Sequence, residues 1–416
     1  MRILFVTPYV PSRIRVRPFY LIRMLAREHE ISLMALVCDE YERALVAEIA
    51  EYCRSVELVG LPRWQSYLYC LGAVPTRTPL RVAYYRSAAF AQRICQVIRE
   101  QCIEVVHGEL IKTVPALQQV VKQTGIPVLY DAVDCISSYL TQQHATTRNL
   151  LKRAFIQTEL RKMGRYEPRM LSRFAQVTIT AEHDRQCLIK MGVARECVHV
   201  VPNGVDTAYF APPGEAREAD SLVFCAKMDY YPNVQGIVTF CQAILPRIWQ
   251  HRPQVRLTIV GNNPPPVVRA LSADERITIT GYVPDIRSYL GKASVALAPL
   301  WVAAGMQNKV LEALAMATPL VATPAACRAL SVQHGVHLLI AEEADAFTDA
   351  ILILLADQQQ AQRLGMAGRQ YVEEVYSWES AGHTLISLYQ SLLCEMRQHD
   401  ASVQQLGKTD AVMRGV

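Results

Sequence analysis

A lysine and a glutamate, Lys309 and Glu312, stand three residues apart inside the apolar segment AAGMQNKVLEALAMATPLVATP (303–324). The pattern predicts a helix over 307–316 that starts just after Gly305, and residues three apart share a helix face. The unpaired N–H groups of its first turn, with Lys309 beside them, favour an anion. A carboxylate only accepts hydrogen bonds and suits a pair of sugar hydroxyls. The pair therefore predicts a seat for a nucleoside diphosphate, and a solvated Lys–Glu pair is the alternative.

Two further strand ends in the second half of the chain carry groups that suit the same ligand. Lys227 ends the strand predicted over 221–228 and can reach the pyrophosphate, although Asp229 is a competing ion-pair partner. The turn GYVPDIRSYL (281–290) presents backbone N–H and C=O groups that suit a base edge. The alternative is a plain turn with Asp285 as the helix N-cap.

Three arginines in the first half, Arg13, Arg15 and Arg17, follow the first predicted strand. Guanidinium groups bind phosphate or an anionic acceptor, and a solvated basic loop is the equal alternative. The arginines stand where a dinucleotide-binding protein carries its glycine-rich loop. No G-x-G-x-x-G occurs in any strand-to-helix turn of this sequence, which argues against a dinucleotide oxidoreductase.

Titratable side chains end two more strands of the first half. VVHGEL (105–110) places His107 and Glu109 at one strand end, and the next strand ends with Asp131 and Asp134. A lone histidine is more often structural than functional. All four side chains nevertheless fall at the strand ends, where open α/β sheets bind ligands.

The elements that must position these groups alternate between strands and helices. Continuous apolar runs bounded by Pro or polar residues predict buried parallel strands with helices on both faces. The alternation stops at a Pro- and Gly-rich linker over 199–220 and then restarts, so we predict two doubly wound α/β halves with the ligand cleft between them. Strands are predicted over 2–9, 31–37, 103–109, 126–132, 176–181, 221–228, 256–261, 277–283, 294–300, 319–323 and 337–341. Helices are predicted over 18–28, 148–173, 233–250 and 307–316.

The composition limits the class of protein. The chain has 416 residues, 51% of them hydrophobic, and a net charge of +5. Two large cores are therefore expected and nucleic acid is not an expected partner. The 12 cysteines form no C-x-x-C pair and no zinc spacing, which indicates buried thiols in a reducing cytoplasm. The first residues read as a strand rather than a signal peptide, and no apolar run is long enough to span a membrane.

One segment has the composition of a membrane-interface patch. Residues 61–86 mix Trp64 with several tyrosines and arginines, as segments near a lipid-linked acceptor do. A loop and helix packed on the core is the alternative. The expected location is the cytoplasm, with peripheral contact to the inner face of the membrane left open.

Six motifs in a fixed order resemble one known family. They are VPNGVD (201–206), AKMDYYPN (226–233), VTFCQAILPRIW (238–249), LTIVGNNP (257–264), GYVPDIRSYL (281–290) and GMQNKVLEALAMATPLVAT (305–323). Together they resemble the group 1, GT4-type glycosyltransferases of the GT-B fold, and in particular bacterial sugar transferases of exopolysaccharide synthesis. The resemblance covers nearly the whole chain and is strongest over 200–325.

The resemblance implies roles for the residues at the strand ends. Lys227 and Lys309 would neutralise the donor pyrophosphate, and Glu312 would bind the ribose hydroxyls. The base would meet the backbone near Tyr282 and Val283. The turn of Gly305, Met306 and Gln307 would face the sugar and the phosphates. In the first half, Arg17 belongs to the loop that could contact an anionic group, and His107 is the first candidate for the transferred sugar or the acceptor. Glu109 competes with His107, because relatives often carry a second histidine at that position.

Three positions depart from the family pattern. The first Glu of the usual E-x7-E motif is replaced by Ala304, while Glu312 is the second. The common Arg-then-Lys phosphate pair is reduced to Lys227. The glycine-rich first loop is replaced by PSRIRVRP (11–18). We interpret the first two as features of the polysaccharide-associated branch.

The resemblance also fixes what we expect of the whole chain. We expect an acceptor-side domain over 1–203, completed by a C-terminal helix over about 377–395, a nucleotide-sugar-binding domain over 204–376, and a polar tail over 396–416. The expected reaction is hexosyl transfer with retention of configuration, from a nucleoside diphosphate sugar to a hydroxyl of a glycan or lipid-linked acceptor. No covalent cofactor and no metal are expected. The alternatives are a non-catalytic scaffold of a polysaccharide assembly complex and another GT-B enzyme, such as a sugar-nucleotide epimerase.

Overall fold

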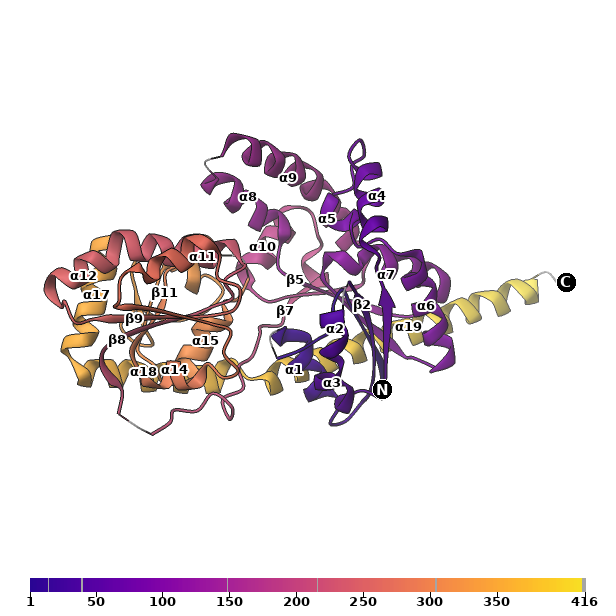
Figure 1. The fold of residues 1–416 in the computed structure, drawn as a ribbon. Coiled ribbons are helices and arrows are strands. Elements are labelled where there is room, and N and C mark those ends of the chain that lie inside the picture. Colours follow the sequence, from indigo (N-terminus) through magenta and orange to yellow (C-terminus); the bar gives the residue numbers. More distant parts are fainter. Residues whose placement is uncertain (14, 39, 148, 215, 304, 414–416) are drawn as a thin grey trace. The chain divides into compact units, whose positions relative to one another are not determined.

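The chain forms two compact units in the computed structural model, which describes residues 1–413 apart from Ile14, Asp39, Arg148, Glu215 and Ala304. Side chains are described for these residues except those of Tyr41, Thr146 and 399–413. Unit 1 comprises Met1–Val201 and Ala381–Val416, and unit 2 comprises Pro202–Ser380. Each unit holds its own parallel sheet covered by helices, as the alternating pattern predicted (Figure 1).

Unit 1 has a seven-stranded parallel sheet in the order β3-β2-β1-β4-β5-β6-β7. Its strands are β1 (Arg2–Thr7), β2 (Glu30–Val37), β3 (Ser55–Gly60), β4 (Val105–Glu109), β5 (Val128–Val133), β6 (Gln176–Ile179) and β7 (Val198–Val200). Its helices are α1 (Val16–Leu25), α2 (Glu40–Ala44), α3 (Val46–Ile49), α4 (Arg63–Ala73), α5 (Leu80–Ala83), α6 (Ala88–Glu100), α7 (Leu110–Thr124), α8 (Ile136–Thr146), α9 (Leu150–Leu171), α10 (Glu182–Lys190) and α19 (Trp378–Met413), with short 3-10 turns η1 (Ala50–Tyr52) and η2 (Arg195–Cys197).

Unit 2 has a six-stranded parallel sheet in the order β10-β9-β8-β11-β12-β13. Its strands are β8 (Glu218–Cys225), β9 (Arg256–Val260), β10 (Ile277–Gly281), β11 (Ala293–Ala298), β12 (Leu320–Ala322) and β13 (Leu339–Ile340). Its helices are α11 (Tyr231–Thr239), α12 (Leu245–His251), α13 (Pro266–Arg269), α14 (Arg287–Lys292), α15 (Asn308–Ala315), α16 (Pro324–Cys327), α17 (Ala344–Ala356) and α18 (Gln358–Val375), with the π-helical turn η3 (Phe240–Ile244) and the 3-10 turn η4 (Ala270–Ala273).

The degree of burial explains which strands could be predicted from the sequence. β1 and β2 lie in the middle of the sheet and are buried along nearly their whole length, so they appear as continuous apolar runs. β3 is an edge strand whose residues are half-buried or exposed, and it gave no such run. The helix predicted over 233–250 is interrupted by the π-helical turn just before Pro246, because proline lacks the N–H that a continuous helix would use.

Each sheet has one point at which the strand order reverses. In unit 1 this point lies between β1 and β4, and in unit 2 between β8 and β11. In open α/β sheets, ligands bind at such a reversal point, outside the carboxyl ends of the strands. The residues that follow β1, β4, β8 and β11 are therefore the first to inspect.

The chain changes unit twice, and the two crossings lie beside each other. Val205 N–H donates to the carbonyl of Tyr376, and a Cβ on Gly204 would lie only 2.5 Å from the backbone nitrogen of Trp378. The units divide between Val201 and Pro202 and again between Ser380 and Ala381. The tail predicted over 396–416 differs in the structure, because α19 continues to Met413.

Candidate functional site

The reversal point of unit 2 brings the two segments that were predicted to bind phosphate to one edge of the sheet. β8 and β11 are neighbours, with Val223 paired to Ala296, so the residues after both strands emerge side by side. A Cβ on Gly236 would lie 2.2 Å from the carbonyl oxygen of Pro299, so α11 packs directly on the backbone that leaves β11. The turn after Lys227 and the turn before α15 consequently lie at the same edge of the unit 2 sheet.

The start of α15 combines a helix N-terminus with a lysine, and within its first turn the N–H of Val310 donates to the carbonyl of Gln307 at 2.9 Å. Its N-cap residue, Gln307, makes no capping hydrogen bond with its side chain. Instead the buried Gln307 accepts from the Lys309 ammonium at 2.8 Å, which holds the cation at the helix start. Asn203 donates to the side-chain oxygen of Asn308 at 3.0 Å and fixes the same turn. Backbone N–H groups, a helix dipole and a lysine thus converge as an anion site requires.

Lys309 and Glu312 are half-buried and titrate near neutrality. Burial lowers the pKa of Lys309 to about 8, and the Glu312 charge opposes that change. Burial raises the pKa of Glu312 to about 7, and the Lys309 charge opposes it in turn. Both charges are poorly solvated at rest, so a diphosphate beside the lysine and hydroxyls beside the glutamate would replace lost hydration. This environment differs from that of a solvated surface pair.

Lys227 is held by the neighbour that the sequence offered as its competitor. Its ammonium lies 3.3 Å from the Asp229 carboxylate, and both side chains are about half exposed. An exposed pair of this kind contributes little energy, so the lysine can turn to a phosphate at small cost. The turn itself is fixed by Asn233, whose side-chain amide donates to the carbonyl of Lys227 at 2.7 Å. The side-chain oxygen of Asn233 is buried and has no partner among the described residues.

The remaining predicted positions of unit 2 lie around the same edge. Gly305 has φ = 58°, a value that suits glycine, and Met306 behind it is buried. Tyr282 and Val283 follow β10 at the sheet margin, where Tyr282 is exposed. Ala304, the position of the missing glutamate, lies outside the described residues.

Arg17 and His107, which the sequence proposed as site residues, are both in contact with protein groups of unit 1. Arg17 is buried in unit 1, where it donates to both Asp131 oxygens at 2.7 and 3.2 Å and to the carbonyl of Val201 at 2.9 Å. His107 is buried with its Nδ1 2.7 Å from the hydroxyl of Tyr389 and its Nε2 3.5 Å from Asp131. These side chains join β4, β5, α1 and α19, and protein groups surround their polar atoms.

Burial and neighbouring charges shift the pKa values of Asp131 and His107. Burial alone would raise the pKa of Asp131, but the charge of Arg17 and the hydrogen bond with His107 hold it well below its ordinary value. Burial lowers the pKa of His107, so the ring is neutral at pH 7. Arg15 is likewise engaged: it pairs with Glu42 and lies over the Tyr9 ring. Arg13 is exposed.

Glu109 is a buried titratable group at the carboxyl end of β4, and one of its oxygens has no hydrogen-bond partner among the described residues. It ends β4 and is buried; its Oε1 lies 3.4 Å from the Tyr9 hydroxyl, while its Oε2 has no partner among the described residues. Burial and the Asp131 charge raise the pKa of Glu109 to about 8. The next residue, Leu110, has φ = 64°, a conformation that costs energy in a residue with a side chain. Strain and an unpaired carboxyl thus coincide at the reversal point of unit 1.

Similar features occur at the end of β5. Val133 has φ = 65°, which is rare for a β-branched residue. The half-buried Asp134 follows it, and burial together with the charge of Asp184 raises the pKa of Asp134 to about 7. The carboxyl ends of two adjacent strands therefore hold carboxyl groups that titrate close to neutrality.

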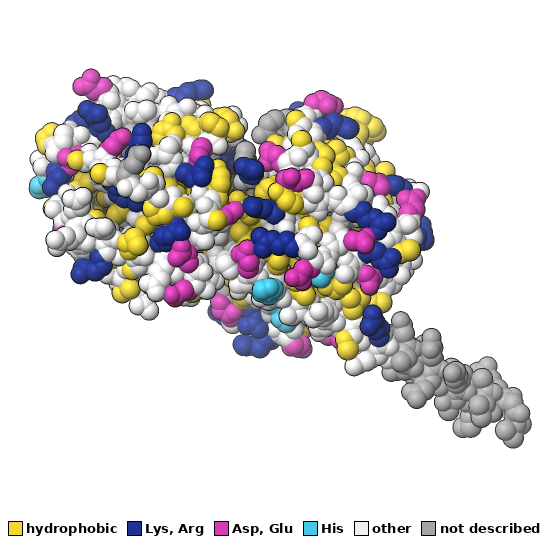
Figure 2. Space-filling model, turned by 90° about the horizontal axis from the view of Figure 1, so that it is seen from below, with side chains coloured by type: hydrophobic (Ala, Val, Ile, Leu, Met, Phe, Trp, Pro, Cys, Tyr) yellow, Lys and Arg dark blue, Asp and Glu magenta, His cyan; other side chains and the backbone are white. Residues whose placement is uncertain are grey.

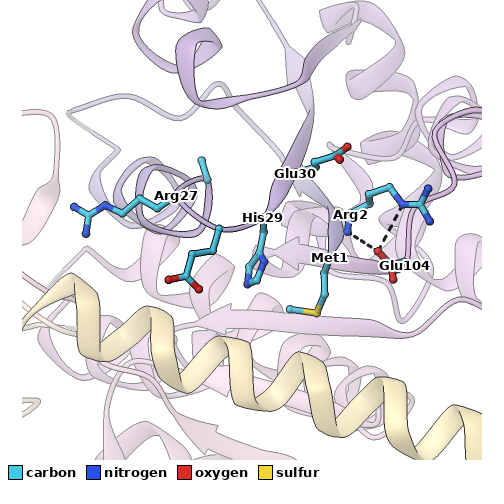
Figure 3. Close-up of a pocket in the computed structure, with 8 residues that line it drawn as sticks. Met1, Arg2, Arg27, His29, Glu30 and Glu104 are labelled. Atoms are coloured by element: carbon cyan, nitrogen blue, oxygen red, sulfur yellow. Dashed lines mark hydrogen bonds and ion pairs between the residues drawn. The ribbon is translucent and has the colours of Figure 1, made fainter.

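A hollow at the opposite edge of the unit 1 sheet is separate from these groups. It lies where β1 and β2 begin, and Figure 3 shows Met1, Arg2, His29 and Glu30 around it. Glu104 accepts from the backbone N–H of Arg2 at 2.7 Å there. Because α/β sheets bind ligands at the carboxyl ends of their strands, this hollow is not the candidate site.

Two family models cover both units. The model described as glycosyl transferase 4-like domain matches residues 15–204, and the model described as glycosyl transferases group 1 matches residues 219–357. The chain belongs to the group 1 glycosyltransferases. The first model begins after β1 and includes β4 with Glu109, and the second includes the β8–β11 edge with Lys309 and Glu312 of this glycosyltransferase family member.

Curated relatives of this group 1 glycosyltransferase chain are distant. The MMP alpha-(1->4)-mannosyltransferase of Mycolicibacterium hassiacum is 26% identical over 230 residues, which is 53% of this chain and 54% of the relative. The lipopolysaccharide core biosynthesis mannosyltransferase LpcC of Rhizobium leguminosarum bv. viciae is 26% identical over 271 residues, 60% of this chain and 74% of the relative. The match with the mycobacterial relative thus spans about half of that protein.

Solved structures show the GT-B fold. Alr3699/HepE of Anabaena, in complex with UDP, has a TM-score of 0.67 at 14% identity, covering 94% of this chain and 100% of that one. The sucrose-phosphate synthase of Thermosynechococcus elongatus has a TM-score of 0.72 at 17% identity, covering 95% and 100%. The two doubly wound units predicted for this glycosyltransferase family member are confirmed at the level of the fold.

Three contacts near the candidate residues of this family member were not predicted from the sequence. Tyr9 meets Glu109, Asn203 meets Asn308, and Asn233 holds Lys227. Asn203 and Asn233 sit inside motifs whose side chains the sequence gave no reason to single out. Their partners lie on other elements, so only the folded chain joins them.

Proposed function

We propose that this chain transfers a hexosyl group from a nucleoside diphosphate sugar to a hydroxyl acceptor, with retention of configuration at the anomeric carbon. The observation that carries the proposal is the uncapped start of α15 at the β8–β11 reversal point, with Lys309 held there by Gln307. Support for a nucleotide donor comes from the UDP complex of the Anabaena structure and from the relative named as a GDP-mannose-dependent mannosyltransferase.

The departing diphosphate is the group that most needs stabilisation in this reaction. The first-turn N–H groups of α15 and the ammonium groups of Lys309 and Lys227 supply positive charge where negative charge develops. Glu312, on the same helix, accepts from the ribose hydroxyls. The base lies against the backbone near Tyr282 and Val283. Because the protein's own cations balance the leaving group, we propose transfer without a metal ion.

The acceptor side falls to unit 1, and Glu109 replaces His107 in this proposal. With a pKa of about 8, the Glu109 carboxyl is mostly protonated at pH 7 and donates a hydrogen bond to a hydroxyl of the transferred sugar or of the acceptor. We propose a glycan or lipid-linked acceptor in exopolysaccharide or glycolipid synthesis. The relative LpcC, named for lipopolysaccharide core biosynthesis, supports that class.

The test is protection by nucleotides. UDP, GDP and dTDP are added separately to the full chain, and one of them should raise the melting temperature, since a ligand that binds only the folded state stabilises it. Lys309→Ala should lose that increase together with hydrolysis of the matching nucleotide sugar. Lys292→Ala is the matched control, because the exposed Lys292 precedes β11 and lies at the other edge of the sheet. Flat melting with all three nucleotides would support the scaffold alternative.

A further inference from the structure

The helix α4 has its large and small side chains reversed relative to an ordinary surface helix. Its buried residues are Ser66 and Ala73, which are small. Its large apolar side chains face outward: Trp64 is 66% exposed, Leu68 58% and Leu71 68%. A surface helix normally buries its apolar face, so this face is built to contact something other than the core of unit 1.

The exposed residues of α4 follow helical spacing and continue onto a neighbouring helix. Trp64, Tyr67, Leu68 and Leu71 repeat at intervals of three and four, and Val74 extends the row. The start of α9 adds the exposed side chains of Leu150, Leu151 and Phe155. Among the described residues, α4 with Val74 carries five of the fourteen exposed large hydrophobic side chains, so this row is not the ordinary scatter of surface apolar residues.

Two contacts hold α4 and α9 together as one surface. The ammonium of Lys162 on α9 donates to the carbonyls of Ala73 and Val74, at 3.0 Å each. Glu159 on α9 accepts from the backbone N–H of Leu80, at the start of α5. Figure 1 shows α4, α5, α8 and α9 grouped on one side of unit 1. We call the outward side chains of residues 63–86 and 150–165 the α4–α9 surface.

The charge of the α4–α9 surface has one sign. These two stretches contain nine basic residues and a single acidic one, Glu159, which is buried. The basic residues are Arg63, Arg77, Arg81, Arg86, Lys152, Arg153, Arg161, Lys162 and Arg165. By contrast, Figure 2 shows basic and acidic side chains interspersed on the face seen from below.

We propose that the α4–α9 surface docks on a membrane that contains anionic lipids. Trp, Tyr and Leu side chains insert at the level of the headgroups, while the flanking arginines and lysines neutralise lipid phosphates. A protein partner would bury the apolar row without needing nine basic residues in the same two stretches. Among the residues described, we find no helix with the length and apolar character required to span a bilayer.

The experiment is flotation of the full chain with vesicles of phosphatidylcholine alone or with added phosphatidylglycerol. We expect binding to the anionic vesicles, weaker binding at high salt, and little binding to phosphatidylcholine. The double variant Leu68→Ser/Leu71→Ser should bind roughly tenfold or more weakly, because two exposed leucines no longer leave water. The double variant Arg77→Gln/Arg161→Gln should lose most of the salt-dependent part of its binding to anionic vesicles.

The matched control is Val267→Ser/Ile353→Ser, which removes two side chains that are 49% and 46% exposed in unit 2. It should float like the wild type, and both double-serine variants should keep the wild-type melting temperature. Failure of the wild type to float with anionic vesicles would overturn the proposal. So would equal flotation of Leu68→Ser/Leu71→Ser, or a dimer in solution that this variant dissociates without any vesicle binding. Flotation needs no nucleotide, so its outcome is independent of the proposed transfer reaction.

Discussion

The hydroxyl of Tyr389 lies 2.7 Å from Nδ1 of His107, so the C-terminal helix is fastened to the central strand β4 of unit 1. The ring is fixed from its other side by Phe5, which stacks on it at 4.4 Å. Leu385 and Leu392 are buried on the same helix. A residue that the sequence nominated for contact with substrate therefore anchors the return of the chain from unit 2.

Tyr389→Phe should destabilise the protein by about 1–2 kcal/mol, because a buried imidazole nitrogen loses its partner while the packing volume is kept. Urea unfolding measures the change. Tyr67→Phe, at an exposed tyrosine, is the control and should leave the free energy of unfolding unchanged. Nucleotide protection should persist in both variants. An unchanged stability of Tyr389→Phe would contradict the anchoring role.

Nucleotide affinity should be greatest between about pH 7 and 8. Below its pKa of about 7, Glu312 loses the charge that accepts from ribose, and above its pKa of about 8, Lys309 loses the charge that meets phosphate. Titration calorimetry with the protecting nucleotide at several pH values measures the decrease in affinity on the acidic side (the acidic limb) and on the alkaline side (the alkaline limb). Glu312→Gln should weaken binding and remove the acidic limb, and Lys309→Met should remove the alkaline limb. If either variant kept both the acidic and the alkaline decrease in nucleotide affinity, the pH dependence would come from groups other than Glu312 and Lys309.

Glu109→Gln should stabilise the protein at alkaline pH. The folded-state pKa of Glu109 is raised to about 8, so the wild type loses stability as the pH rises from its unfolded value of 4.5 through 8. The amide does not titrate, and the stability difference at pH 9 should be on the order of 2–4 kcal/mol in favour of the variant. Denaturant unfolding at pH 6 and pH 9 tests this.

The same position distinguishes a catalytic from a structural role. Glu109→Gln keeps a hydrogen-bond donor and should retain most transfer at pH 7, whereas Glu109→Ala should lose at least tenfold in turnover with nucleotide protection intact. Equal turnover of the wild type and Glu109→Ala would remove Glu109 from the acceptor side.

Arg217 should be among the most sensitive positions of unit 2. Its guanidinium donates to backbone carbonyls at the ends of α14 and α15, including those of Leu290, Met316 and Ala317 at 2.9–3.0 Å. Arg217→Met leaves these carbonyls unpaired and should cost about 2–4 kcal/mol. Arg217→Lys should recover only part, because an ammonium lacks the planar fork. Arg276→Met, at a surface pair with Asp274, is the control and should cost much less than Arg217→Met.

The sequence by itself determined the fold class, and it indicated the carboxyl ends of the strands as the edge at which we propose the chemistry. Buried strands show as apolar runs, and parallel strands with intervening helices follow from their alternation with helical patterns. The positions of Lys227, Lys309 and Glu312 after β8 and β11 follow from that order alone. Edge strand β3 and the three-residue β7 were missed, because their half-exposed residues give no continuous apolar run.

Only the tertiary structure decided which charged side chains are already engaged. Arg17 and Asp131 are 114 residues apart in the chain, and His107 and Tyr389 are 282 apart, so local spacing carries no signal of either contact. The same holds for α4, whose periodic sequence predicts a helix but not which of its faces meets the core. Burial and partnership are properties of the whole packed chain, and they moved the acceptor-side proposal from His107 to Glu109.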